Sequence, residues 1–143
     1  MREISPNETE KLYDCLEALA KHHNQVSVFF KGDYPQIPSE QKIVQFGKEL
    51  AEGRSRIAVI ENEHKVIGFC KINTDGSRGI VEYLVVLDQE RGKGYGAAFM
   101  DWALNAFRKL GINEIDVKAV YGNEAIRFYE KYGDRILYIW SVR

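Results

Sequence analysis

The sequence predicts an α/β (α+β) fold with a mixed, mostly antiparallel central sheet of about six strands flanked by about four helices. Short apolar strands with tight connections fill the middle of the chain, and a glycine-rich turn then leads into a long amphipathic helix. Another strand follows that helix. A strand–helix–strand crossover of this kind should make residues 80–87 and 112–117 parallel neighbours.

The N-terminal part should form one short strand and two helices. Residues 1–4 are expected to be the strand. A helix should begin at Ser5, which can act as its N-cap, while Glu8 completes a capping box. A second helix is expected over residues 39–52, and Gly53 can end it in the left-handed conformation.

Three strands should follow in antiparallel order. Residues 56–61 and 65–73 are separated by a three-residue polar connection, and an Asp-Gly pair at 75–76 predicts a hairpin before residues 79–87. That third strand is apolar except for Glu82, so we expect helices to cover both of its faces. The alternation of a strand would put Glu82 on the same face as Leu84 and Val86.

The C-terminal part should alternate helices and strands. A helix is expected up to residue 110, followed by a strand at 112–117, a helix at 123–132 and a last strand at 135–140. The apolar face of the first helix includes Phe99, Trp102, Ala103, Ala106 and Leu110. Only nine residues follow Asp134, which leaves room for one strand and a shortened C-terminal sheet edge.

Composition limits the classes of function. The chain has 143 residues and a formal net charge of −1, which predicts one domain over residues 1–143 and gives no basic footprint for nucleic acid or anionic membrane. No apolar run is long enough to span a membrane and no signal peptide is recognisable, so we expect a soluble, cytoplasmic protein. The two cysteines are expected to be reduced thiols, and the three histidines show no metal-ligand spacing.

The turn at residues 91–96 has the features of an anion site. It lies between an apolar strand and a helix, and the first N–H groups of a helix have no internal partner. Glycines allow phosphate oxygens to approach the backbone, and Arg91 and Lys93 add positive charge. A diphosphate is therefore the expected ligand.

Two phosphate-binding designs remain open at this point. The spacing Gly92-x-Gly94-x-x-Ala97 fits a dinucleotide-binding fingerprint, and Asp116 stands where a ribose-binding acid would be expected. That design would make the protein a nicotinamide-dependent oxidoreductase. Against it, about 90 residues of antiparallel meander precede the turn, whereas the fingerprint normally opens its fold.

The second design resembles the GCN5-related N-acetyltransferase (GNAT) superfamily. The string Arg91-Gly92-Lys93-Gly94-Tyr95-Gly96 fits its cofactor signature [QR]-x-x-G-x-[GA], and residues 123–133 resemble its C-terminal motif. The order of elements before residue 87 also matches. The resemblance implies transfer of an acetyl group from acetyl-CoA to a primary amine by direct attack in a ternary complex.

The resemblance also implies the cofactor contacts. The turn's backbone would hold the pyrophosphate of coenzyme A through Arg91, Gly92, Lys93, Gly94, Tyr95 and Gly96. The main chain of Val85, Val86 and Leu87 would pair with the pantetheine amides. Asn123 would cap the last helix near the cofactor arm, and the sheet would open between the third strand and residues 112–117.

Two residues are candidates for catalysis. Tyr129 stands where the family often has a general acid for the leaving thiolate, and the alternative is a core ring with a satisfied hydroxyl. Glu82 could be the base for the incoming ammonium, because burial would raise its pKa, or it could simply form an ion pair. The acceptor pocket is expected to include Phe29, Phe30 and Tyr34, which could instead pack as a hydrophobic loop.

Three matters stay open in the sequence. It identifies neither the amine acceptor nor the length of the acyl group. The short C-terminal segment also fits a non-catalytic module that binds CoA or only dimerises. An exposed sheet edge would favour a homodimer.

Overall fold

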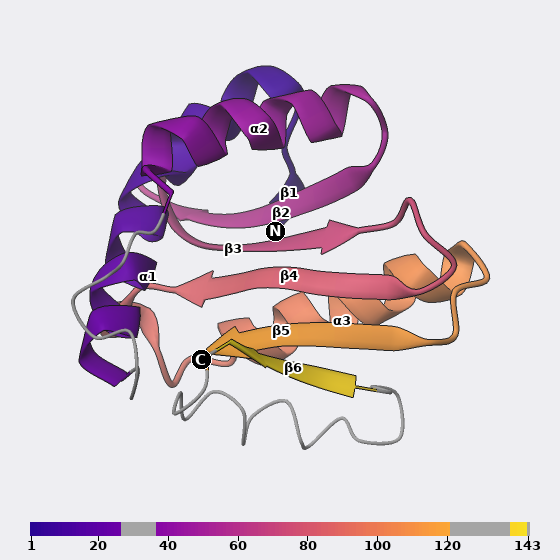
Figure 1. Ribbon diagram of the computed structural model, residues 1–143. Helices are drawn as coiled ribbons and strands as arrows, with labels where there is room; N and C mark the ends of the chain where they lie inside the picture. The colour runs from indigo at the N-terminus through magenta and orange to yellow at the C-terminus, as the bar shows by residue number, and fades with distance from the viewer. Residues whose placement is uncertain (27–36, 121–137, 143) are drawn as a thin grey trace.

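The computed structural model describes residues 1–26, 37–120 and 138–142, and its backbone is a single twisted sheet with helices on both faces (Figure 1). The six strands lie side by side in chain order, from β1 to β6. Neighbours from β1 to β4 are antiparallel, whereas β4, β5 and β6 are mutually parallel. The predicted mixed, mostly antiparallel sheet and its crossover are therefore confirmed.

The strand boundaries agree with the prediction to within a few residues. The first strand is shorter than expected, and the last, which is described over 138–142, ends later than the expected 135–140. The strands are β1 (Arg2–Glu3), β2 (Ser55–Asn62), β3 (Lys65–Asn73), β4 (Gly79–Val86), β5 (Ile115–Val120) and β6 (Tyr138–Val142).

Three α-helices are present among the described residues: α1 (Tyr13–Val26), α2 (Ser39–Ala51) and α3 (Tyr95–Lys109). The predicted start at Ser5 is confirmed, but its first turns are a 3₁₀ helix, Pro6–Leu12, which continues into α1. The Glu8 carboxylate accepts a hydrogen bond from the Ser5 N–H at 3.0 Å, as a capping box requires. The helix predicted at 123–132 lies outside the described residues.

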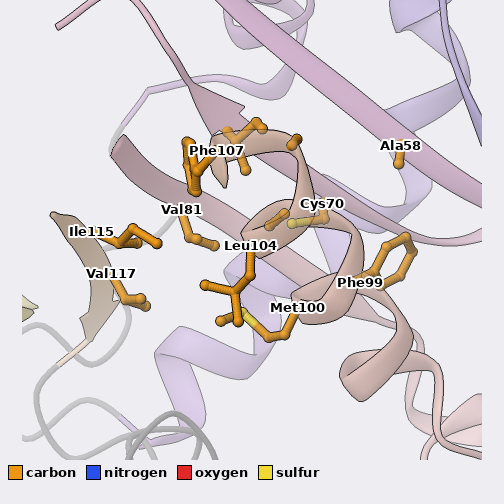
Figure 2. Close-up of a cluster of buried hydrophobic side chains, with 12 residues drawn as sticks. Ala58, Cys70, Val81, Phe99, Met100, Leu104, Phe107, Ile115 and Val117 are labelled. Atoms are coloured by element: carbon orange, nitrogen blue, oxygen red, sulfur yellow. The ribbon is translucent and has the colours of Figure 1, made fainter. Parts of the chain in front are cut away.

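Two apolar clusters cover the two faces of the sheet. Helix α3 packs on one face, where Phe99, Met100, Leu104 and Phe107 meet strand residues such as Val81 (Figure 2). The 3₁₀ helix, α1 and α2 pack on the other face, around Leu12, Leu16, Phe46 and Phe69. Strand β4 is covered on both faces, as its apolar sequence predicted. Leu110, expected on the buried side of α3, is 54% exposed because the helix has already ended there.

Strand β4 departs from regular pairing in two places. A bulge shifts its register with β3, because Lys71 pairs with Tyr83 while Ile72 pairs with Val81, which leaves Glu82 as the extra residue. Within the described chain, β4 pairs with β5 only through Gly79–Val81 and Ile115–Val117. We call the point where this pairing ends, at Glu82 and Lys118, the β4–β5 fork.

The described helices include none that is both long and apolar enough to cross a bilayer.

Candidate functional site

The glycine turn takes the conformation that its sequence demands. Gly92 has φ +81° and Gly94 has φ +85°, both in the left-handed region that residues with a Cβ rarely adopt. Gly94 is the N-cap of α3. A Cβ added at either glycine would meet no other atom within 4 Å, so the space beside the turn is open to a ligand.

The head of α3 offers backbone donors to that space. The first bond of the helix runs from the Ala98 N–H to the Gly94 carbonyl at 3.1 Å. The N–H groups of Tyr95, Gly96 and Ala97 precede that bond and have no carbonyl partner inside the helix. Together with the helix dipole, they form the backbone part of an anion site.

The two basic side chains of the turn are exposed and held by local ion pairs. Arg91 contacts Asp88 at 3.3 Å, and Lys93 contacts Glu90 at 2.7 Å. The Glu90 carboxylate raises the pKa of Lys93 through that hydrogen bond. Exposed pairs of this kind contribute little stability, so both cations can turn toward an arriving phosphate at small cost.

The residues predicted to pair with the pantetheine amides are Val85, Val86 and Leu87, which we call the Val85–Leu87 track. Of these three, Val86 is the one whose main-chain groups face the fork. The Leu87 N–H donates to the Ile67 carbonyl of β3 at 3.0 Å, and the Val85 carbonyl also faces β3, where a Cβ on Gly68 would come within 2.8 Å of it. Because alternate residues of a strand bond toward opposite edges, Val86 faces the β5 side. Its carbonyl accepts a hydrogen bond from Arg91 Nε at 3.3 Å.

Glu82 lies at the fork, but on the opposite face from the one predicted. Leu84 and Val86 pack against the α3 cluster, whereas Glu82 forms an ion pair with Lys71, which lies beside Phe46 of α2. The bulge is the physical reason. The extra residue breaks the alternation, so Glu82 shares the α2 side of the sheet with Tyr83, whose ring packs on Phe46.

A fully buried ammonium holds Glu82. Lys71 Nζ is within hydrogen-bond distance of three oxygens: Glu82 Oε1, Asn73 Oδ1 at 2.7 Å and Glu49 Oε2 at 3.3 Å. The other oxygen of Glu82 lies 3.5 Å from Lys118 Nζ, across the fork. Lys71 itself has no exposed surface, and its ammonium is 5.0 Å from the centre of the Phe46 ring.

The pKa of Glu82 moves opposite to the prediction. Burial, the largest single influence, would raise the pKa of this carboxyl, as expected from the sequence. The charges of Lys71 and Lys118, with hydrogen bonds from Lys71 and Asn73, outweigh burial together and lower the pKa below that of an ordinary glutamate. Glu82 is therefore an ionised carboxylate at neutral pH.

The acid proposed for a dinucleotide site has another partner. Asp116 is 3% exposed and forms an ion pair with Arg78, which precedes β4. The side chains described contain no cluster of three or more groups suited to binding a metal ion.

Several predicted site residues lie outside the described part of the chain: Tyr129, Asn123, Phe29, Phe30 and Tyr34.

Conversely, the sequence analysis missed four residues that surround Glu82: Lys71, Glu49, Asn73 and Lys118. A signal for the first of these was present, because Lys71 interrupts an apolar strand as Glu82 does in the next one.

Comparison with known proteins identifies the family. The family model described as "Acetyltransferase (GNAT) domain" matches residues 53–133, which is more than half of the chain and includes the turn. No curated protein matches the sequence.

Solved structures with similar folds include enzymes that bind coenzyme A. A PaiA N-acetyltransferase from Thermoplasma acidophilum, solved with coenzyme A, is 16% identical with a TM-score of 0.75, over 92% of this chain and 86% of that one. A predicted acetyltransferase from Clostridium acetobutylicum, solved with acetyl-CoA, is 18% identical with a TM-score of 0.70, over 92% and 86%. At these identities the likeness shows the fold alone.

Proposed function

Because this chain belongs to the GNAT acetyltransferase family, we propose that it transfers the acetyl group of acetyl-CoA to a primary amine. The observation that carries the proposal is the turn before α3. It combines left-handed Gly92 and Gly94, open space beside them, and backbone N–H groups without a helical partner. This combination suits the pyrophosphate of coenzyme A.

The rest of the cofactor would follow β4 toward the fork. With the pyrophosphate at Gly92–Gly96, the pantetheine arm would run along the edge of β4 that β5 leaves unpaired. Val86 is the residue of the Val85–Leu87 track whose main chain faces this edge. The Val86 carbonyl would accept a hydrogen bond from a pantetheine amide in place of the one from Arg91. The Arg91 side chain would then be able to contact the phosphates.

The chemistry would be a direct displacement. The neutral amine attacks the thioester carbonyl, the new C–N bond forms, and the C–S bond breaks with its electron pair on sulfur. A main-chain N–H on the open edge of β4 would stabilise the oxyanion of the tetrahedral intermediate. The proton lost by the amine would pass to Glu82 directly or through water, and Tyr129 would supply the proton for the leaving thiolate.

The acceptor should approach from the α1–α2 side of the fork. Glu82 lies on that side, with 22% of its side chain exposed. The class of amine is best found by measuring thiol release from acetyl-CoA with amino acids, polyamines, aminoglycosides and peptide N-termini.

A pair of matched glycine variants tests the cofactor site. Gly94→Ala places a side chain at φ +85°, while Gly53→Ala does the same at φ +73° behind α2, and both added carbons meet open space. The two changes should therefore lower stability by a similar amount, about 1 kcal/mol. Only Gly94→Ala should weaken acetyl-CoA binding, by about tenfold or more, because only there does the added carbon lie beside the phosphates.

Isothermal titration with acetyl-CoA, CoA and NADH measures this difference. The expected result is binding of acetyl-CoA and CoA but not NADH, weakened in Gly94→Ala and unchanged in Gly53→Ala. Equal weakening in both variants, or no binding of acetyl-CoA to the unmodified protein, would contradict the proposed cofactor site.

A further inference from the structure

The ammonium of Lys71 is saturated by its neighbours. A protonated lysine has three N–H donors, and Lys71 Nζ has three oxygen acceptors, one each from Glu49, Asn73 and Glu82. The side chain is completely buried. Lys71 can therefore neither touch a substrate nor exchange its partners without leaving a buried charge unpaired.

The carboxylate of Glu82 is held at both oxygens. Oε1 contacts Lys71 on the interior side, and Oε2 lies 3.5 Å from Lys118 on β5, at the fork. The Asn73 side chain also bonds to Glu82 and accepts from Lys71, so the three residues form a closed arrangement. Because the bulge breaks the alternation between Glu82 and Tyr83, Glu82 lies on the α2 side with Lys71 and not on the α3 side with Leu84 and Val86.

We propose that Lys71 is a positioning residue that keeps Glu82 ionised and fixed at the β4–β5 fork. Lys71 acts from the interior through Glu82, and its partners Glu49 and Asn73 hold the ammonium in place. The part of this proposal that concerns catalysis rests on the proposed acetyl transfer. The part that concerns the charge state of Glu82 does not.

The other charged groups near Glu82 determine how much of its charge stabilisation should come from Lys71. Helix α2 contributes Glu49, which bonds to Lys71, and Lys42, which Glu82 influences electrostatically. Helix α1 contributes Glu17, which acts on Lys42, and β5 contributes Lys118. Of the two lysines that contact Glu82, Lys71 is fully buried, whereas 34% of the Lys118 side chain is exposed. Solvent screens Lys118, so Lys71 should dominate.

The first test reads the charge state directly. Carbon-13 NMR of the glutamate carboxyl groups gives the titration midpoint of Glu82, and its signal is assigned by its absence in Glu82→Gln. In the unmodified protein the midpoint should lie below that of an ordinary glutamate, about 4.3. Lys71→Met should raise it above that value, since burial is then opposed only by weaker contacts, and the control Lys118→Met should raise it less.

These titration midpoints decide the proposal without any measurement of enzyme activity. A midpoint at or above the ordinary value in the unmodified protein would overturn the proposal, as would a shift in Lys118→Met equal to that in Lys71→Met. Because Lys71→Met leaves Glu49 buried without its partner, the double variant Lys71→Met/Glu49→Gln repeats the measurement with that charge removed.

The second test reads the consequence for turnover. The ratio of kcat/KM at pH 5.5 to that at pH 8 should be at least about threefold lower in Lys71→Met than in the unmodified protein, because part of Glu82 is then protonated at the lower pH. In a Glu82→Gln background, the Lys71 substitution should leave the pH profile unchanged. A profile that moves equally in both backgrounds would show that Lys71 acts through the fold alone.

If no amine supports turnover, the proposed function fails while the NMR result still decides the charge state of Glu82.

Discussion

At the scale of single residues, Gly68 is a position where β3 leaves no room for a side chain beside the strand that would carry the cofactor. A Cβ at this position would lie 2.8 Å from the Val85 carbonyl and 3.2 Å from the Phe99 ring. The carbonyl belongs to the backbone of β4, so it cannot move aside without shifting that strand. Gly68 therefore permits β4 to lie where Val86 faces the fork.

Replacing this glycine should destabilise the protein. We expect Gly68→Ala to lower the free energy of unfolding by about 1–3 kcal/mol, as in other overpacked interiors, and to weaken acetyl-CoA binding through the shifted Val86. Urea denaturation and calorimetry measure the two effects. Gly76→Ala is the control, because its nearest contact would be an ordinary 3.6 Å from the Arg78 carbonyl. A Gly68→Ala protein as stable as that control would refute the close approach.

The sequence predicted single residues well where backbone chemistry alone decides them. The left-handed glycines at 92 and 94 are of this kind, because few other residues fit that conformation. The surroundings of Glu82 were not predictable in the same way. Alternation counted back from Leu84 and Val86 would put Glu82 on the α3 side. The bulge breaks that alternation between Glu82 and Tyr83, so Glu82 lies on the α2 side with Lys71. The pKa then follows from neighbours that strand alternation did not identify.

At the scale of elements, the β2–β3 hairpin has an unfavourable turn. Asn62 pairs with Lys65, so the turn consists of Glu63 and His64, whose φ angles are +53° and +66°. Two positive φ angles are typical of a type I′ turn, which favours Asn-Gly. Residues other than glycine, asparagine and aspartate enter this conformation at a cost of about 1 kcal/mol each.

A turn of preferred composition should stabilise this hairpin. The double change Glu63→Asn/His64→Gly should raise the free energy of unfolding by about 1 kcal/mol, because the strain at both positions is relieved. Denaturant titration gives the change in midpoint at constant slope. The opposite variant, Glu63→Val/His64→Val, should lower stability, since branched side chains fit this conformation worst. Equal midpoints for all three proteins would contradict the turn assignment.

The elements were predictable because their signals are local. Apolar runs with short connections indicated the three central strands, and the capping box indicated where the first helix begins. A cap does not determine the hydrogen-bond pattern of the turns that follow, which explains why the 3₁₀ helix at Pro6–Leu12 was missed. Strand ends also depend on partners distant in sequence, as the brief pairing of β4 with β5 shows.

At the scale of the whole molecule, each side of the sheet contains one buried thiol. Cys15 belongs to the cluster under α1 and α2, and its thiol donates weakly to the Val66 carbonyl at 3.7 Å. Cys70 belongs to the cluster under α3 (Figure 2). Both side chains are fully buried. Burial raises the pKa of Cys15 to about 12 and raises that of Cys70 as well.

These thiols predict how stability changes at high pH. In the unfolded chain a thiol loses its proton near pH 8.5, whereas in the folded protein Cys15 keeps it until about pH 12. The unfolded state therefore binds fewer protons in this interval, and stability must fall as the pH rises. Each thiol should contribute a slope of about 1.4 kcal/mol per pH unit above roughly pH 9, in addition to the contributions of tyrosine and lysine.

Removing the thiols one at a time tests whether the two sides of the sheet unfold together. Cys15→Ser keeps a donor for the Val66 carbonyl, and Cys70→Ala leaves only a small change in an apolar site. In a single cooperative transition, each variant should flatten the slope of unfolding free energy between pH 9 and 10.5 by the same amount, and the double variant by about twice as much. Urea titrations at several pH values give these slopes. If only Cys15→Ser altered the main transition, the cluster under α3 would unfold separately from the cluster under α1 and α2.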